Sequence, residues 1–446
     1  MKSLLEPATR LLIWIVAASV MIAALLWPAL WNGFPILSDD TGGYLGRPFE
    51  GTLLFGRSAF YGAFLALGIP LNFWPNLVAQ AALLAWLIVL GLRTHGFGGR
   101  PWLAAATVIC LSGLTSLAWF ASQLMPDTLV PVAVFSLYLV AFRAPMLKRW
   151  EKIVLGAAIM AAMASHMSIV GLAVALIVVL VLLRPYFAKL RLPQPNLLPA
   201  ALAVLLGVAL GPLSNLGIAG RLEFTPGGAN FVLARLIESG IVERYLSDQC
   251  PDDPTIQLCA FRGHLPPTGD EWLWEASSPL FKLGGSDKFG PEAQRIVLTS
   301  LQLYPGQRLA AAFVSAAQQF FNVGLGYTTK LWHWHASWTL ERLAPNAVES
   351  FFRSRQGKSQ SDLSWLSMIH VPVAWVAITS LLLFVMPVGR HRIQPAVAAL
   401  SAVILAALLS NAAICGSFAV PADRFQNRLV PLAPFAAGLA ALSRRR

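Results

Sequence analysis

The chain has 446 residues, of which 57% are hydrophobic and only 12% are charged. A soluble globular protein carries roughly 25% charged and about 45–50% apolar residues, so this apolar excess is too large for an ordinary core and must face lipid. The composition therefore excludes a typical soluble domain and predicts an all-α polytopic membrane protein.

The net charge of +12 would suggest a nucleic-acid partner if the protein were soluble. Here the basic residues instead collect in short clusters beside apolar runs, which is typical of cytoplasmic loops and tails. Beyond Lys2 and Arg10, the clusters are residues 93–100, 143–152, 184–191, 390–392 and 444–446. No basic stretch is interleaved with aromatic residues as in a single-strand binder. We therefore expect membrane lipids, and no nucleic acid, as partners.

A helix needs about 20 apolar residues to cross a bilayer, and the positive-inside rule then sets its direction. Together they predict about ten spans in a bacterial inner membrane, with both termini cytoplasmic. In chain order the spans are residues 11–31, 72–92, 102–120, 128–143, two short helices within 153–183, then 197–216, 365–387, 394–413 and 429–442. Every basic cluster then lies on the cytoplasmic side.

The apolar run 153–183 is too long for one span and too short for two full ones. The polar tetrapeptide Ser165-His166-Met167-Ser168 interrupts it near its middle. We predict two short helices that meet at this tetrapeptide on the outer side. One long tilted helix is the alternative, and it would invert the topology of everything downstream. Basic clusters on both sides of the run favour two crossings.

This topology divides the chain into three regions. Residues 1–216 form an N-terminal transmembrane bundle of about seven spans, with a first outer loop at 32–71. Residues 217–363 form a mainly helical periplasmic region between the seventh and eighth spans, and 364–446 form a C-terminal bundle of about three spans. Within the periplasmic region, 311–321 is predicted to be an interfacial amphipathic helix.

The four cysteines fall into two groups. Cys110 and Cys415 lie in apolar spans and are expected to pack as small hydrophobic residues. Cys250 and Cys259 lie in the periplasmic region, where an oxidising environment favours a disulfide over two unlinked thiols.

The first outer loop carries an acidic pair, Asp39 and Asp40, followed by two glycines. Acidic residues contribute little to membrane topology, so the pair points to a site. Neighbouring carboxylates raise one another's pKa, and such a group can deprotonate a hydroxyl or bind a divalent cation such as Mg²⁺ or Mn²⁺. Helix capping in a turn is the alternative.

Three more polar residues of the predicted outer loops have two interpretations each. Arg57 either approaches a lipid phosphate or snorkels to the headgroups. Asp127 either stabilises a helix N-terminus or adds a third carboxylate to the same face. His166 either bonds a backbone carbonyl, or binds a phosphate or relays a proton.

Two segments near the C-terminal half are also unusual. Arg424 and Arg428 lie on the predicted outer face, where arginine is uncommon, and guanidinium groups bind phosphate well. Pairing with Asp423 or with lipid headgroups is the alternative. The hexapeptide 330–335, Lys-Leu-Trp-His-Trp-His, would fit metal or sugar binding, but an interfacial aromatic belt is the default interpretation.

Asp39-Asp40 after the first span, Pro126-Asp127 in a later outer loop and Arg424-Phe425 before the last span together resemble the GT-C-type membrane glycosyltransferases. The resemblance implies a sugar donor linked to polyprenyl phosphate and a periplasmic glycan, lipid or protein acceptor. It also implies that Asp39 or Asp40 is the catalytic base or a metal ligand. Phe425 departs from the tyrosine usual in that family.

By the same resemblance, Arg424 or Arg428 would hold the lipid phosphate. The other residues expected to contact substrate are Tyr44, Arg57, Asp127 and His166.

The sequence thus favours an enzyme that transfers a sugar, over two alternatives. A transporter or flippase of a lipid-linked or anionic substrate would need charges near the membrane midplane and internal repeats, and the spans show almost none. A non-catalytic membrane assembly protein would use its outer region to bind a partner.

Overall fold

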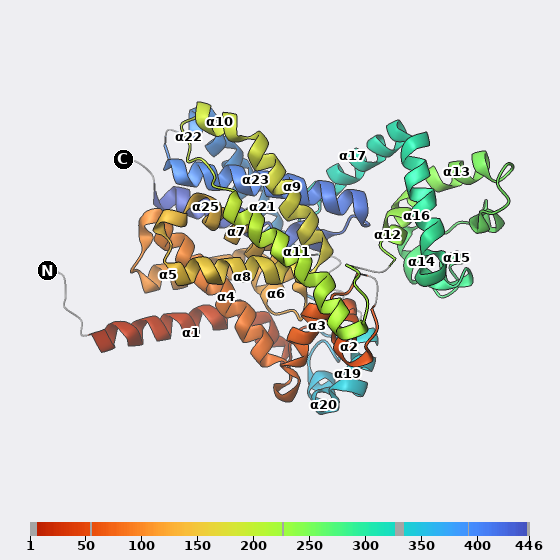
Figure 1. The fold of residues 1–446 in the computed structure, drawn as a ribbon. Coiled ribbons are helices and arrows are strands. Elements are labelled where there is room, and N and C mark those ends of the chain that lie inside the picture. Colours follow the sequence, from red (N-terminus) through yellow and green to blue (C-terminus); the bar gives the residue numbers. More distant parts are fainter. Residues whose placement is uncertain (1–6, 54–55, 225–226, 326–333, 391, 444–446) are drawn as a thin grey trace.

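The computed structural model describes residues 7–53, 56–224, 227–325, 334–390 and 392–443, and these residues form helices and no strand (Figure 1). Within them, five helices are long and apolar enough to cross a membrane: α1 (Pro7–Asn32), α4 (Trp74–Leu92), α11 (Leu198–Ala219), α21 (Ser367–Val385) and α23 (Pro395–Phe418). Three shorter apolar helices are α5 (Pro101–Leu114), α7 (Leu129–Phe142) and α9 (Met167–Leu182). The helical membrane class follows from their length and composition.

Each of the predicted spans coincides with a helix, because α8 (Arg149–Ser165) and α25 (Leu432–Leu442) occupy the other two segments. The number of crossings itself stays a prediction. The remaining short helices of the bundle are α6 (Leu117–Ala121), α10 (Arg184–Lys189), α22 (Pro387–Arg390) and α24 (Asp423–Asn427), with 3-10 turns η1 (Ile69–Leu71), η3 (Pro126–Thr128), η4 (Ala144–Met146) and η6 (Ser364–Leu366), and a π-turn η2 (Arg93–Phe97).

The helix α23 lies at the centre of the bundle. It is apolar all around its circumference, as expected for a helix that lies in a core or spans a membrane, and most of its residues are buried in the bundle. It packs against α7, α9, α17 (Pro305–Phe321), α21 and α25. One continuous apolar core joins these helices to α1, α4, α5, α8 and α11.

The connecting segments gather at two ends of this bundle. At one end, Arg93 Nη2 donates to Glu151 at 2.6 Å, and the Tyr186 hydroxyl donates to the Val385 carbonyl at 3.0 Å. The first contact joins the predicted cytoplasmic clusters 93–100 and 143–152, and the second joins the cluster 184–191 to the end of α21, which precedes the cluster 390–392.

The run 153–183 is broken at the predicted tetrapeptide. The helix α8 ends at Ser165, His166 has an extended backbone (φ −157°, ψ 129°), and α9 begins at Met167. The chain therefore forms two helices here rather than one long helix. His166 lies at the opposite end of the bundle from Glu151 and Arg184.

The first outer loop folds into two helices, α2 (Asp39–Glu50) and α3 (Ala59–Ala66). The Ser38 N–H donates to Thr41 Oγ1 at 2.8 Å, and Asp39 and Asp40 fall in the first turn, where the helix dipole favours negative charge. The two helices approach so closely that a Cβ at Gly62 would lie 2.2 Å from the Tyr44 carbonyl oxygen.

The predicted periplasmic region, 217–363, does not form a single packed unit. Residues 229–304, called the outer module below, enclose a core of their own around Trp272 and Phe289 and lie to the right in Figure 1. Their helices are α12 (Ala229–Glu238), α13 (Ile241–Gln249), η5 (Gln257–Phe261), α14 (Gly269–Trp274), α15 (Pro279–Lys282) and α16 (Gly285–Leu303). The predicted disulfide between Cys250 and Cys259 is present in this module.

The rest of that region packs on the bundle instead. The helix α17 lies along α23, and α19 (Trp334–Leu343) packs on α2 and on α20 (Pro345–Arg353). The predicted amphipathic segment 311–321 is the C-terminal part of α17, with Phe313 and Phe321 exposed. Residues 330–333 of the Trp- and His-rich hexapeptide, and the side chains of its last two residues, lie outside the described residues.

Candidate functional site

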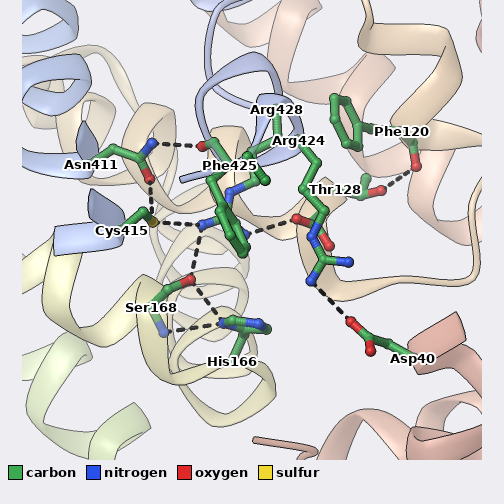
Figure 2. A network of polar contacts seen from close by, with 12 residues as sticks. Asp40, Phe120, Thr128, His166, Ser168, Asn411, Cys415, Arg424, Phe425 and Arg428 are labelled. Carbon is green, nitrogen blue, oxygen red and sulfur yellow. Dashed lines mark hydrogen bonds and ion pairs between the residues drawn. The ribbon is translucent and has the colours of Figure 1, made fainter. Parts of the chain in front are cut away.

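Asp40 lies between two arginines at the end of the bundle opposite the basic loops. Its Oδ1 accepts a hydrogen bond from Arg57. Its Oδ2 accepts one from Arg424 Nη2 at 2.9 Å (Figure 2). Asp40 and Arg424 are 384 residues apart in the chain. The structure therefore brings the acidic pair of the first loop to the arginine segment that precedes the last helix.

Three different elements position these side chains. The first turn of α2 carries the aspartates, α24 carries Arg424, and the segment before α3 carries Arg57. The Arg57 guanidinium also lies 5.9 Å from the centre of the Tyr44 ring and 5.4 Å from the Trp274 ring. Contacts of a cation with aromatic faces at these distances are attractive and help to fix the guanidinium.

The two aspartates have opposite electrostatic environments. Burial alone would raise the pKa of Asp40, but Arg57 and Arg424 outweigh it and hold that pKa well below its usual range. Burial, and then the charge of Asp40, raise the pKa of Asp39 to about 6, although Arg424 and Arg57 oppose the shift. One carboxylate is thus a fixed anion, and its neighbour exchanges a proton near neutral pH. When the environments of two neighbouring carboxylates push their pKa values apart, the two groups can take different chemical roles.

A second ion pair lies deeper at the same end. Asp127 Oδ1 accepts from Arg428 Nη1 at 2.8 Å, and both side chains are almost fully buried. The Asp127 carboxylate therefore pairs with an arginine from the other end of the chain, and η3 has no side-chain cap. Arg428 Nη2 also donates to Ser168 Oγ at 2.9 Å and lies 3.6 Å from Cys415 Sγ (Figure 2).

Ser168 links Arg428 to His166. Its backbone N–H lies 3.1 Å and its Oγ 2.8 Å from His166 Nδ1. Since Oγ already accepts from Arg428, its own proton points to Nδ1. That nitrogen then acts as an acceptor, and the ring proton is assigned to Nε2. The Asp127–Arg428–Ser168–His166 chain orients the imidazole.

Tyr44 lies beneath this cluster and is fully buried against Tyr61, at 5.3 Å between ring centres. Within the described residues its hydroxyl has no hydrogen-bond partner. A buried hydroxyl without a partner is costly, and such groups mark places where a water or a ligand is bound.

A small pocket of about 20 Å³ lies beside Arg57. Arg57 and Ser58 form one wall, His166 lies at the break between α8 and α9, and Asn215 and Phe224 come from the end of α11 and the segment after it. The pocket is therefore lined by residues from three separate parts of the chain, with Arg57 and His166 on its wall.

All eight residues singled out in the sequence lie in this one region, but they do so in two layers. Asp39, Asp40, Arg57 and Arg424 form a partly exposed cluster, while Asp127 and Arg428 form a buried pair. Arg428 is therefore a less suitable phosphate ligand than Arg424. Sequence analysis did not single out Ser168 or Trp274, although Trp274 ends the acidic and aromatic run 270–274.

A divalent cation does not fit this arrangement of donors. Both carboxylate oxygens of Asp40 already accept from guanidinium groups, which a cation would have to displace. Across the residues that the structure describes, no group of three or more His, Cys, Asp or Glu side chains could hold a metal ion.

Fold and site together define an all-helical protein, with helices long enough to cross a membrane and an acid–arginine cluster at one end of its bundle. In comparisons with known proteins, no family model, no curated protein and no solved structure matched this chain.

Proposed function

We propose that the protein is a membrane glycosyltransferase that moves a sugar from a polyprenyl-phosphate donor to an acceptor on the periplasmic side of a bacterial inner membrane. The topology that goes with this proposal has about ten crossings and cytoplasmic termini. The observation that carries it is the position of Asp40 between Arg57 and Arg424, with the protonatable Asp39 next to it.

Asp39 is the base of the proposed reaction. The acceptor hydroxyl attacks the anomeric carbon, a new C–O bond forms, and the bond from that carbon to the phosphate oxygen breaks. The hydroxyl proton passes to Asp39, whose raised pKa makes it a better proton acceptor than an ordinary aspartate. Asp40 cannot take this role while two guanidinium groups hold it as an anion.

Arg57 and Arg424 stabilise the leaving group. The two guanidinium charges are balanced by Asp40 and by the ionised Asp39 that acts as base, and the cluster gains one positive charge when Asp39 takes the proton. The donor is a phosphodiester with one negative charge, and bond cleavage converts it to a phosphomonoester with a second. Arginine binds phosphate oxygens through two parallel N–H donors, and this interaction strengthens as charge develops. The step needs no metal ion.

The donor lipid would approach the cluster beside Arg57, where the small pocket lies near the end of α11. Its wall at the end of α11 continues into apolar residues that face outward from the bundle, among them Leu213 and Leu216, which are 55% and 44% exposed. A polyprenyl chain lying along this surface would present its phosphate at Arg57.

Replacing Asp39 by Asn tests the function. We expect envelope glycans, profiled by mass spectrometry, to lose one modification in cells that express only Asp39→Asn at normal membrane abundance. Asp252→Asn, on the exposed surface of the outer module, is the control and should leave the profile unchanged. If Asp39→Asn and Asp40→Asn both leave the glycans unaltered, the proposal fails.

A further inference from the structure

The short helix α14 places two tryptophans on opposite sides. Residues two apart on a helix point about 200° away from each other. Trp272 is fully buried in the core of the outer module, where its ring meets Phe289. Trp274 instead faces the bundle, 5.4 Å from the Arg57 guanidinium, and 45% of its surface is exposed. The module thus presents a large aromatic surface at the edge of the acid–arginine cluster.

A series of polar contacts holds α14 at this place. The N–H of Gly269, its first residue, donates to Glu238 at 2.6 Å, and Glu238 is paired with Arg235. Arg235 also donates to Ser315 on α17 at 2.7 Å. The same α17 exchanges two hydrogen bonds of 2.9 Å, through Gln319, with the backbone of the residue before α24. The position of α14 is therefore tied to the segment that carries Arg424.

Asp270 lies in the first turn of α14 and is exposed. Desolvation and the charge of Asp40 raise its pKa, while Arg424 opposes them. One acidic side chain of the outer module therefore lies within electrostatic range of the cluster, on the same short helix as Trp274.

We propose that α14 is the acceptor-binding wall of the site and that the acceptor is a carbohydrate. Trp274 provides a flat apolar surface for the C–H face of a sugar ring, and the Asp270 carboxylate accepts hydrogen bonds from sugar hydroxyls. This inference rests on the proposed glycosyl transfer and specifies its acceptor. The donor reaches Arg57 from the lipid side, and the acceptor reaches Asp39 from the module side.

A positioning role for Trp274 has different consequences. If the ring only fixed Arg57, its loss would weaken the binding of the lipid phosphate. If it binds acceptor, its loss leaves lipid binding intact and lowers transfer. The test therefore combines glycan profiles in cells with binding of decaprenyl phosphate to the purified full-length chain, measured by native mass spectrometry.

The variants are Trp274→Ala, Trp274→Phe and Asp270→Asn. Trp338→Ala is the matched control, because Trp338 is an exposed tryptophan 4.2 Å from the Arg342 guanidinium. We expect Trp274→Ala to lower the modified glycan about tenfold, which corresponds to about 1.4 kcal/mol. Its decaprenyl phosphate binding should stay within about twofold of wild type. Trp274→Phe should recover most of the modification, Asp270→Asn should lower it, and Trp338→Ala should leave it unchanged.

Three results would overturn the inference. If Trp274→Ala leaves the glycan profile unchanged while Asp39→Asn abolishes the modification, α14 does not bind the acceptor, but the proposed glycosyl transfer stands. Equal losses of glycan and of decaprenyl phosphate binding in Trp274→Ala assign the ring to Arg57 alone. An unchanged glycan profile in Asp39→Asn would contradict both the proposed function and this inference.

Discussion

Two ion-pair groups lie at the same end of the bundle and differ in their access to water. The Asp127 and Arg428 side chains are 2% and 1% exposed, whereas Asp40, Arg57 and Arg424 are 14%, 13% and 19% exposed. The buried pair is neutral as a unit and is closed to ligands. The more exposed group has one more guanidinium than its fixed carboxylate. The first therefore holds the fold together, and the second is available for an anionic substrate.

The energetic expectation follows from this difference. Removing one partner of a buried ion pair leaves an uncompensated charge in a medium of low polarity, which costs about 3–5 kcal/mol. Fully exposed pairs contribute only about 0–1 kcal/mol, because water solvates either partner when the other is lost. The Asp40 group is partly exposed and is expected to lie between these limits. Variants that destabilise the protein more at the Asp40 group than at the Asp127–Arg428 pair would contradict this comparison.

The largest effect is expected for Arg428→Met. It should lower the free energy of unfolding by about 3–5 kcal/mol, because Asp127 is left charged and buried. Unfolding of the purified protein in mixed micelles measures this. The double variant Asp127→Leu/Arg428→Met should recover most of the loss. A single variant as stable as wild type would contradict the assignment of this pair to the fold.

The next effect is expected for Gly62→Ala, which places a methyl group 2.2 Å from the Tyr44 carbonyl oxygen. Overpacking of this kind costs about 1–3 kcal/mol, and it should separate α2 from α3 and so Asp40 from Arg57. Glycan modification should fall as well. Gly156→Ala, within α8 and with nothing near its added Cβ, is the control and should be neutral or stabilising by about 0.5–1 kcal/mol.

A smaller loss of stability than in Arg428→Met is expected for Arg424→Ala, because Asp40 keeps Arg57 as a partner and is less deeply buried than Asp127. The same variant should abolish glycan modification, since the leaving phosphate loses a guanidinium. Unfolding and glycan profiles of one preparation measure both effects. If Arg424→Ala unfolds readily but still modifies glycan, the Asp40–Arg57–Arg424 cluster stabilises the fold and does not bind the substrate.

A further change, expected in Asp39→Asn, depends on pH. The folded protein raises the pKa of Asp39 from 3.8 to about 6, so the wild type loses stability as pH rises from about 4 through 6. The Asn variant lacks this titration. Its melting temperature should match wild type near pH 4, exceed it at pH 8, and show most of the change between these values. An equal difference at both pH values would exclude the raised pKa.

The sequence was sufficient to predict the helices and to select residues that the structure places together in the candidate site. Long apolar runs separated by basic clusters give the helix positions, and the polar tetrapeptide around His166 marks the break between α8 and α9. Charged residues in outer loops stand out in a chain with so few charges. The disulfide between Cys250 and Cys259 follows from their short separation and predicted compartment.

The pairing of those residues could not be predicted. Arg424 and Arg428 are four residues apart and look equivalent in the sequence, yet one pairs with Asp40 and the other with Asp127. Which aspartate meets which arginine depends on the tertiary packing of α24. The division of 217–363 was missed for the same reason, because an amphipathic helix such as α17 has an apolar face whether it covers a module or the bundle.

The most direct test of the central claim is the discharge of a lipid-linked sugar by the purified protein. Full-length protein reconstituted in liposomes would be incubated with polyprenyl-phosphate sugars and a membrane glycan extract, and the lipids would be followed by mass spectrometry. We predict that wild type converts one lipid-linked sugar to free polyprenyl phosphate and that Asp39→Asn does not. Equal, unchanged lipid profiles for the two proteins would contradict glycosyl transfer at this site.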